Sequence, residues 1–289
     1  MWFKNLYVFK LEQHWAARSH EIEGVLSDHR FVSQSLSSVS TGWVPPREDD
    51  DRLVVSVQGQ LLMAFRIEKK LLPASVVNGA VKERAKVIEK EQGHRLGRMQ
   101  MKDLKEQIVD ELLPMAFSVA KDIKVWIDPV NQFVVFDTAS PSQADEITAA
   151  LGKAMNPYPL EGIYLPQSLH MTAWTISGQP PVGFTIDDES QWENDDGVIR
   201  YLRHNVTGNE MQARFNDRFL CTRLGMTWQD KISFVLTESA VLKRIKPLDI
   251  IQNTQSEDHD ESERRDSEFV LMTLELSAML IDLFDSLED

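Results

Sequence analysis

The chain has 289 residues, a formal net charge of −14, 42% hydrophobic residues and 26% charged residues, which is ordinary for a soluble globular protein of one large domain or two smaller ones. A single cysteine, Cys221, excludes an intramolecular disulfide framework and a cysteine-rich zinc site, and it suits a reducing compartment. Because the sequence has neither a secretory-signal pattern nor an apolar stretch long enough to span a membrane, we expect a cytoplasmic protein without membrane contact.

The negative charge is concentrated at the C-terminal end. Residues 255–289 carry twelve acids and two bases, and the rest of the chain carries 33 acids and 29 bases. Bases outnumber acids by eight to four from Lys82 to Lys105, and by nine to four from Val198 to Lys246. A polyanion responds to the local field more than to the total charge, so the acidic total does not exclude a nucleic-acid partner. The distribution is also consistent with two solvated faces and an acidic tail.

The first elements of the chain follow from hydrophobic periodicity. Alternation predicts a strand at 2–9, and helical spacing predicts an amphipathic helix at 12–26. Residues 42–46 are expected to be irregular, because two prolines fix φ and remove hydrogen-bond donors. Alternation then predicts a hairpin with strands at 53–57 and 61–67.

Residues 76–113 have helical composition with two interruptions. Gly93 and Gly97 break the pattern, and few large apolar residues lie between 86 and 102, so the segment cannot bury a wide face. We therefore expect two helices with a loose joint, which project from the body as a helical arm at 73–120.

The second half of the chain mixes strands and helices. The expected elements are strands at 123–127 and 133–136, a helix at 140–154 that begins at Ser140-Pro141, a stretch at 156–197 rich in proline and glycine that resists assignment, a strand at 198–206, a helix that begins near 207–210, strands at 219–226, 231–236 and 241–245, a polar, mobile linker at 252–265 and a helix at 269–284.

Together these elements predict an α+β fold with mixed or antiparallel sheets. The α/β body is expected to comprise residues 1–72 and 121–254, and residues 255–289 form an acidic linker and a C-terminal helix. The hairpins at 53–68 and 231–246 both end in a basic cluster before a proline, which hints at an internal duplication.

The sequence contains no local motif for catalysis, cofactor binding or metal binding. It lacks a phosphate-binding glycine loop, a dinucleotide fingerprint and a Gly-x-Ser-x-Gly elbow, and its seven histidines lack metal-ligand spacing. The run Asp49-Asp50-Asp51 could hold magnesium, but it is far more typical of a solvated turn. We therefore expect no catalytic residues, no cofactor and no metal, and a protein that is not an enzyme.

Two basic segments are candidates for contact with DNA phosphates. In a strict strand at 198–206, Arg200 and His204 share one face and Arg203 lies on the other. Such a strand can contact phosphate, but charge on an edge strand also protects it against aggregation. In the arm, the candidates are Lys82, Lys86, Lys90, Arg95 and Arg98. Nothing favours base readout over backbone contact, and a solvated helix with no ligand fits the same pattern.

An ordered set of short motifs spans the chain. They are Trp2-Phe3-Lys4-Asn5-Leu6, Gly42-Trp43-Val44-Pro45-Pro46, Lys69-Lys70-Leu71-Leu72-Pro73, Leu112-Leu113-Pro114-Met115-Ala116-Phe117-Ser118, Trp126-Ile127-Asp128, Gly197-Val198-Ile199-Arg200, Leu242-Lys243-Arg244 and Phe269-Val270-Leu271-Met272-Thr273. In order and spacing, this set resembles the bacterial RdgC family of recombination-associated proteins over essentially the whole chain.

The resemblance implies a ring-shaped homodimer that encircles duplex DNA without sequence preference. It also implies a nucleoid-associated protein that restrains RecA-promoted strand exchange and has no catalytic activity. It places Phe117 where the helical arms meet across the dimer, with Leu113 and Met115 beside it. It places Arg203 and His204 on a strand that faces the DNA.

Two other functions stay open. One is a protein-interaction module that binds the recombinase directly, with incidental DNA contact, and salt-sensitive retention of DNA distinguishes this class from a DNA-binding protein. The other is a nuclease built from Asp49, Asp50, Asp51 and distant acids, which metal-dependent cleavage would establish.

Overall fold

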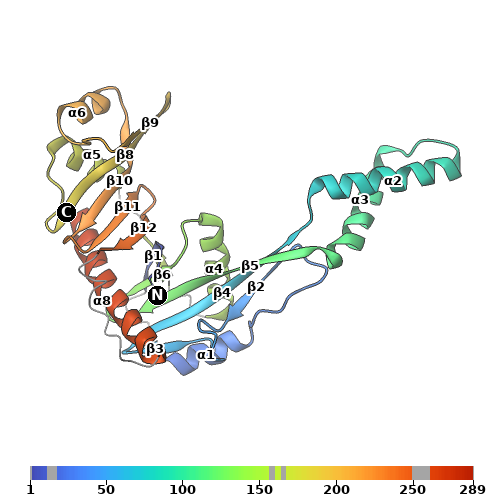
Figure 1. Ribbon diagram of the computed structural model, residues 1–289, viewed down its shortest axis with the longest axis horizontal. Helices are drawn as coiled ribbons and strands as arrows, with labels where there is room; N and C mark the ends of the chain where they lie inside the picture. The colour runs from blue at the N-terminus through green and yellow to red at the C-terminus, as the bar shows by residue number, and fades with distance from the viewer. Residues whose placement is uncertain (1, 12–17, 156–159, 164–166, 249–260, 289) are drawn as a thin grey trace. The chain divides into compact units, whose positions relative to one another are not determined.

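The computed structural model describes residues 2–11, 18–155, 160–163, 167–248 and 261–288 (Figure 1). The chain divides into two compact units, of which the first comprises Met1–Val25, Pro45–Met63 and Lys124–Asp289, and the second comprises Leu26–Val44 and Ala64–Ile123. The second unit is larger than the helical arm expected at 73–120. It also takes in strand residues, because β4 (Gln60–Leu71) and β5 (Phe117–Asp128) each continue from one unit into the other.

The fold is α+β, as the sequence predicts. Neighbouring strands follow the order β2-β4-β5-β6-β1-β12-β11-β10-β8-β9, with β3 beside β4 and β7 beside β1. Every strand pair whose register the structure gives is antiparallel. The other strands are β1 (Asn5–Leu11), β2 (Val39–Val44), β3 (Val55–Val57), β6 (Phe133–Phe136), β7 (Leu160–Gly162), β8 (Phe184–Asn194), β9 (Gly197–Leu202), β10 (Leu220–Trp228), β11 (Ile232–Thr237) and β12 (Val241–Pro247).

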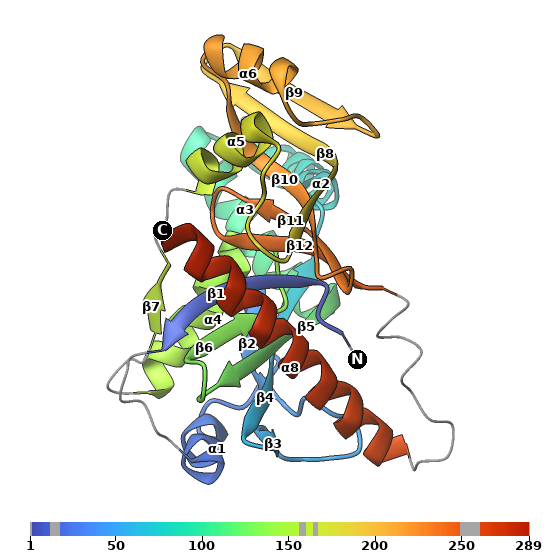
Figure 2. The ribbon, with the colours of Figure 1, turned by 90° about the vertical axis from the view of Figure 1, so that its left-hand side faces the viewer.

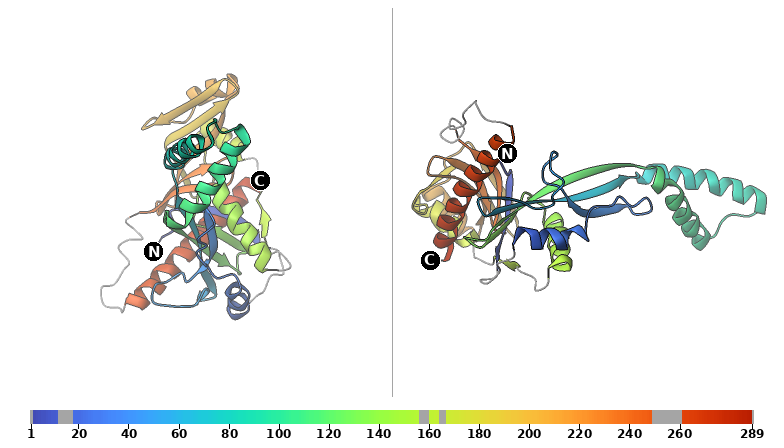
Figure 3. Two further views of the ribbon diagram at one scale, coloured as in Figure 1. Left: turned by 90° about the vertical axis from the view of Figure 1, so that its right-hand side faces the viewer. Right: turned by 90° about the horizontal axis from the view of Figure 1, so that it is seen from below.

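The helices of the second unit, α2 (Ala74–Gln92) and α3 (Arg98–Leu112), pack side by side (Figures 1 and 3). The buried stripe between them is Val77, Val81, Ala85, Leu104 and Ile108. Gly93 ends α2 with a φ of +75°, which favours glycine, and its N–H donates to the carbonyl of Glu89 at 2.9 Å. The two helices, the joint at the glycines and the narrow buried face all agree with the sequence-based prediction.

The core of the first unit lies between its sheet and α8 (Glu261–Glu288), which crosses one sheet face in Figure 2. Leu276, Leu280 and Leu283 of α8 are fully buried in one cluster with Trp228 of β10 and Leu242 of β12. Burial of a large apolar side chain contributes about 1.5–3 kcal/mol, so this helix is a major part of the core. The remaining helices are α1 (Ser19–Ser27), the short helix η1 (Leu113–Met115), α4 (Pro141–Ala154), α5 (Gln167–Ser177) and α6 (Asn209–Asn216).

The start of α8 corrects the sequence-based prediction, which placed it at Phe269. The helix begins at Glu261, so the described end of the predicted linker is helical, whereas residues 249–260 lie outside the described part of the chain. The early start is supported by an acidic first turn, which favours a helix N-terminus, and by Arg265 Nη1, which pairs with Asp49 Oδ1 at 3.0 Å.

The prediction of an irregular stretch at 42–46 is wrong for its first three residues. Residues 42–44 belong to β2 and pair with residues 64–66 of β4, because the two prolines follow the strand and remove none of its hydrogen-bond donors.

Two further differences concern the middle of the chain. The strand predicted at 198–206 ends at Leu202, because Arg203 has a left-handed φ of +54° that takes the chain out of the strand. The unassigned stretch at 156–197 contains the helix α5 and the long strand β8. The prolines and glycines of this stretch break the hydrophobic pattern, which conceals both elements in the sequence.

Candidate nucleic-acid interface

Arg200 lies on β9, at one end of the sheet order, and its side chain is held against the neighbouring strand. Its Nε donates a hydrogen bond of 2.8 Å to Oε1 of Gln191, the residue directly opposite on β8. This contact orients the guanidinium over the sheet, where its remaining N–H groups can bind a phosphate oxygen.

Arg203 and His204 lie in the turn that follows β9. His204 Nε2 is 3.0 Å from Oε2 of Glu210, and its ring stacks on Tyr201 with 5.3 Å between centroids. The hydrogen bond from His204 holds the pKa of Glu210 below its usual range. The prediction that Arg200 and His204 share one strand face is therefore wrong, because the strand ends before the turn and Arg203 changes the chain direction.

A groove of about 390 Å³ lies on the face of the first unit's sheet that points away from the core. Arg223 lines this groove while its neighbour Leu224 is fully buried in the core, and Lys243 lines it beside the fully buried Leu242. The groove is lined by Asn5, Glu189, Ser190, Gln191, Arg200, Tyr201, Leu202, Arg223, Val235, Lys243 and Arg244.

Four of the lining residues are cations that come from three strands. Arg200 is on β9 and Arg223 on β10, and Lys243 and Arg244 are on β12. Only Arg200 is among the residues predicted from the sequence. The other three belong to the segment with an excess of bases from Val198 to Lys246. That excess was the only sequence signal for them, and it could not show that they lie on one face of the sheet.

A β-bulge explains why two consecutive residues, Lys243 and Arg244, line the same groove. Val235 pairs with Lys243 and Ser233 with Lys246, so β12 has one more residue than β11 between these pairs. Arg244 has a φ of +56°, a backbone conformation that is uncommon outside glycine. In a regular strand the two side chains would point to opposite faces, so the bulge creates this part of the site.

Two cations of the groove, Arg223 and Lys243, form no ion pair with any residue that the structure describes. Burial lowers the pKa of Lys243, and the charge of Arg223 lowers it further. Two like charges that share a groove repel each other, and an anion between them relieves that repulsion. The geometry therefore suits a phosphate group.

The cations predicted on the arm are all exposed. Lys82, Lys86 and Lys90 follow one flank of α2, Arg95 lies in the turn after it, and Arg98 is the first residue of α3. Their accessibility fits contact with phosphate and fits a solvated helix. They belong to the second unit, whereas the groove belongs to the first.

Among the described residues of the second unit, the two most exposed large apolar side chains lie where α3 passes into β5. Met115 and Phe117 expose 74% and 85% of their surface. Leu113, the third residue expected at a dimer interface, is only 6% exposed and packs within its own chain. Large apolar side chains in water indicate a surface that another molecule covers, so Met115 and Phe117 carry the candidate contact.

The comparisons with known proteins agree with the motifs along the chain. The model of the family described as "RdgC: Putative exonuclease, RdgC" matches residues 1–289. The chain belongs to the RdgC family. The "Recombination-associated protein RdgC" of Burkholderia ambifaria is 44% identical to it over 294 residues, which cover 99% of this chain and 96% of the relative. The proteins of that name from Cupriavidus necator and Janthinobacterium sp. are 43% and 44% identical, each over 99% of this chain and 98% of the relative.

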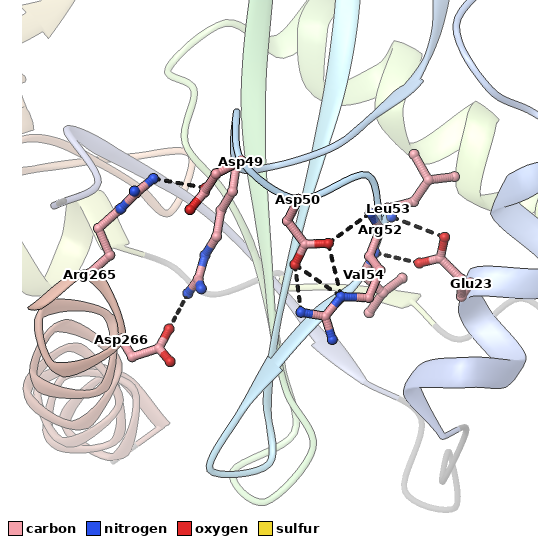
Figure 4. A network of polar contacts seen from close by, with 9 residues as sticks. Glu23, Asp49, Asp50, Arg52, Leu53, Val54, Arg265 and Asp266 are labelled. Carbon is pink, nitrogen blue, oxygen red and sulfur yellow. Dashed lines mark hydrogen bonds and ion pairs between the residues drawn. The ribbon is translucent and has the colours of Figure 1, made fainter. Parts of the chain in front are cut away.

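The RdgC family description mentions an exonuclease, and the relatives are named for recombination. In the described part of this family member, no group of three or more His, Cys, Asp or Glu side chains could hold a metal ion. Two acids of the suspected magnesium run are paired with arginines (Figure 4). Asp49 accepts from Arg265, and Asp50 accepts from the Arg52 guanidinium at 2.5–2.9 Å. The hydrogen bond from Arg52 lowers the pKa of Asp50.

Two smaller expectations can also be compared with the structure of this RdgC-family chain. Cys221, which the sequence left without a disulfide partner or a cysteine-rich zinc site, is fully buried, and burial raises the pKa of its thiol. Among the helices that the structure describes, none is both long and apolar enough to cross a membrane.

Proposed function

We propose that this RdgC-family protein binds the phosphate backbone of DNA without sequence preference and thereby restrains RecA-promoted recombination. The observation that carries the proposal is the groove of the first unit, in which Arg200, Arg223, Lys243 and Arg244 converge on one sheet face. Four cations against the single lining carboxylate of Glu189 make the groove locally positive in a chain with a net charge of −14.

The geometry favours phosphate contact over base readout. Readout of bases needs side chains that a helix or ribbon carries into the major groove, whereas these cations are spread over the face of a broad sheet. Arg200 and Arg244 also use part of their donor capacity on Gln191 and Glu189. Contacts of this type position a protein on DNA, allow it to slide, and weaken steeply with salt.

A ring-shaped homodimer is the assembly that we propose for this function. Its support is the exposed pair Met115 and Phe117, which a second copy would cover. A ring around the duplex adds a topological constraint, so that modest phosphate attraction gives long residence. DNA that is covered in this way is withheld from a recombinase filament, which is a physical reason for antagonism with RecA at the nucleoid.

The first prediction concerns Arg223 and Lys243, the two groove cations without an ion pair among the described residues. The double substitution Arg223→Gln and Lys243→Gln should weaken binding to two unrelated duplexes by the same factor, about 10- to 100-fold at low salt, because two phosphate contacts are lost. Fluorescence anisotropy of labelled linear duplexes measures this change. Lys153→Gln, an exposed position on α4 outside the groove, is the control for loss of positive charge and should change affinity by less than about 2-fold.

Other outcomes would point to other functions. A loss confined to one sequence would contradict backbone contact. If DNA affinity is unchanged while restraint of RecA-promoted strand exchange is lost, direct contact with the recombinase is the function. Magnesium-dependent cleavage of the labelled duplex would establish a nuclease.

A further inference from the structure

An ion pair crosses the open face of the sheet in the first unit. Arg244 of β12 pairs with Glu189 of β8, and the strands β11 and β10 lie between them in the sheet order. The two side chains are 64% and 24% exposed, so the pair lies above the sheet and within reach of solvent.

The pair borders two hollows. The groove is one of them, and a smaller hollow of about 260 Å³ is the other, and both are lined by Glu189, Val235 and Arg244. The smaller hollow has mixed charge, with Asp187, Asp188 and Lys246 among its lining residues, beside Gly225, Ser233 and Phe234. Because the same ion pair lines both hollows, its opening would join them into a longer channel over the sheet.

Irregular backbone places both partners of the pair. Arg244 occupies the bulge of β12 with its left-handed φ of +56°. The register between β10 and β8 shifts around Gly225, where residues 187–189 face this one glycine. A Cβ on Gly225 would lie 2.7 Å from Cγ of Glu189, so only glycine lets this carboxylate cross the sheet here. Two separate irregularities thus converge on one contact.

We propose that the Glu189 carboxylate occupies the place of a DNA phosphate on Arg244, so that the Arg244–Glu189 pair is an internal gate which DNA opens to use the whole groove. The gate rests on the proposed function, because it regulates the same phosphate-binding surface. The chemistry is an exchange of one anion for another on the same guanidinium, for which carboxylate and phosphate oxygens are equivalent acceptors.

The Glu189 carboxylate lowers the affinity of the protein for DNA. An exposed ion pair is weak and is screened by salt, so a phosphate can displace the carboxylate. The displaced carboxylate then stays beside the bound phosphate and repels it. Glu189 therefore lowers DNA affinity both before and after the gate opens.

The second prediction tests the gate by removing one charge. Glu189→Gln keeps the shape of the side chain and should raise affinity for duplex DNA by about 3- to 10-fold at low salt, with a gain that shrinks as salt rises. Asp188→Asn is the matched control, because Asp188 lines the smaller hollow and forms no ion pair among the described residues. The control should gain less than about 2-fold. Equal gains would overturn the gate, because a general change of field would explain both.

A double-mutant cycle adds a second criterion. Arg244→Gln should cost little affinity in the parent, where Glu189 engages the arginine, and should cost the whole gain of about 3- to 10-fold in the Glu189→Gln background. The same loss in both backgrounds would overturn the gate. Anisotropy titrations of the four proteins at two salt concentrations supply these numbers.

A second variant, Gly225→Ala, tests the gate independently in case Glu189→Gln does not fold. Gly225→Ala places a Cβ against Glu189, so it should displace the carboxylate and raise affinity in the same direction as Glu189→Gln. Thermal melting of each variant identifies any unfolded sample. Failure of the proposed function gives a different result from failure of the gate. If the groove does not bind DNA, the double substitution Arg223→Gln and Lys243→Gln leaves DNA affinity unchanged.

Discussion

The carboxylate of Asp128 joins three parts of the first unit. It accepts hydrogen bonds from Ser277 of α8 at 2.5 Å, from Gln60 of β4 at 3.1 Å and from the side chain of Asn131 in the β5–β6 turn at 2.7 Å. Burial on its own would raise the pKa of Asp128, but these hydrogen bonds, first of all that from Ser277, outweigh burial and lower the pKa below its usual value. The ionised side chain is therefore part of the fold.

The third prediction follows from that contact. Ser277→Ala should reduce the free energy of unfolding by about 1–3 kcal/mol at neutral pH, because a buried carboxylate loses a donor. Denaturant titration measures the change. Ser286→Ala is the control on the same helix, because its hydroxyl only returns to the carbonyl of Leu283 at 2.7 Å, and it should cost less than about 0.5 kcal/mol.

The pH dependence of this loss has a definite sign. A carboxylate whose folded pKa lies below the unfolded value of about 4 contributes stability above that value, and the contribution disappears as the pH falls through the folded pKa. The cost of Ser277→Ala should therefore shrink below about pH 4. A cost that is constant down to about pH 3 would show that the charge of Asp128 does not matter.

At the scale of elements, ion pairs attach the first turns of α8 to the loop before β3. Arg47 pairs with Asp266 at 2.5 Å and Arg265 with Asp49 at 3.0 Å. Figure 4 shows the pair of Arg265 and Asp49. In the same view, Glu23 of α1 accepts from the backbone N–H groups of the loop at 53 and 54, at 3.0 and 2.7 Å. The loop therefore connects two helices that are far apart in the sequence.

The fourth prediction separates the two ion pairs by burial. The Arg47 side chain is only 11% exposed, so Arg47→Gln removes buried side-chain contacts together with the hydrogen bond to Asp266 and should cost about 1–3 kcal/mol of stability. Arg265 is more exposed, and Arg265→Gln should cost about 0–1 kcal/mol, with a loss that fades in high salt. Denaturant titrations of both variants at two salt concentrations measure the two losses of stability. Equal, salt-independent losses would contradict the ranking by burial.

Elements with a local signal could be predicted from the sequence. The helix α4 begins at Pro141 after Ser140, as the capping pattern indicates, and α2 ends at Gly93. The end of β9 depends on the left-handed backbone of Arg203, and the start of α8 depends on an ion pair with a distant loop. Neither feature can be predicted from hydrophobic periodicity.

The site follows the same rule. The segment with excess bases contains all four cations of the groove, but Arg223 and Lys243 meet only through the sheet order, and Arg244 joins them only through a bulge. An internal duplication of the two hairpins stays a prediction.

At the scale of the whole molecule, the fifth prediction concerns self-association. In a symmetric dimer each copy contributes one Phe117, and burial of both would contribute about 3–6 kcal/mol, so Phe117→Ala should shift the protein toward monomer with its fold intact. Sedimentation velocity measures the shift. Val87→Ala, an exposed apolar position on α2, is the control and should leave association unchanged. If neither substitution changes sedimentation, Phe117 is not at the dimer contact.

The salt dependence of duplex affinity, in the parent protein and in the variant with Arg223→Gln and Lys243→Gln, tests the central claim most directly. If each cation neutralises one phosphate, the plot of log affinity against log salt should be shallower by about 0.9 for each substitution, or about 1.8 for the pair. A slope that is unchanged in the variant would contradict the account, because the cations of the groove would then not contact the DNA backbone.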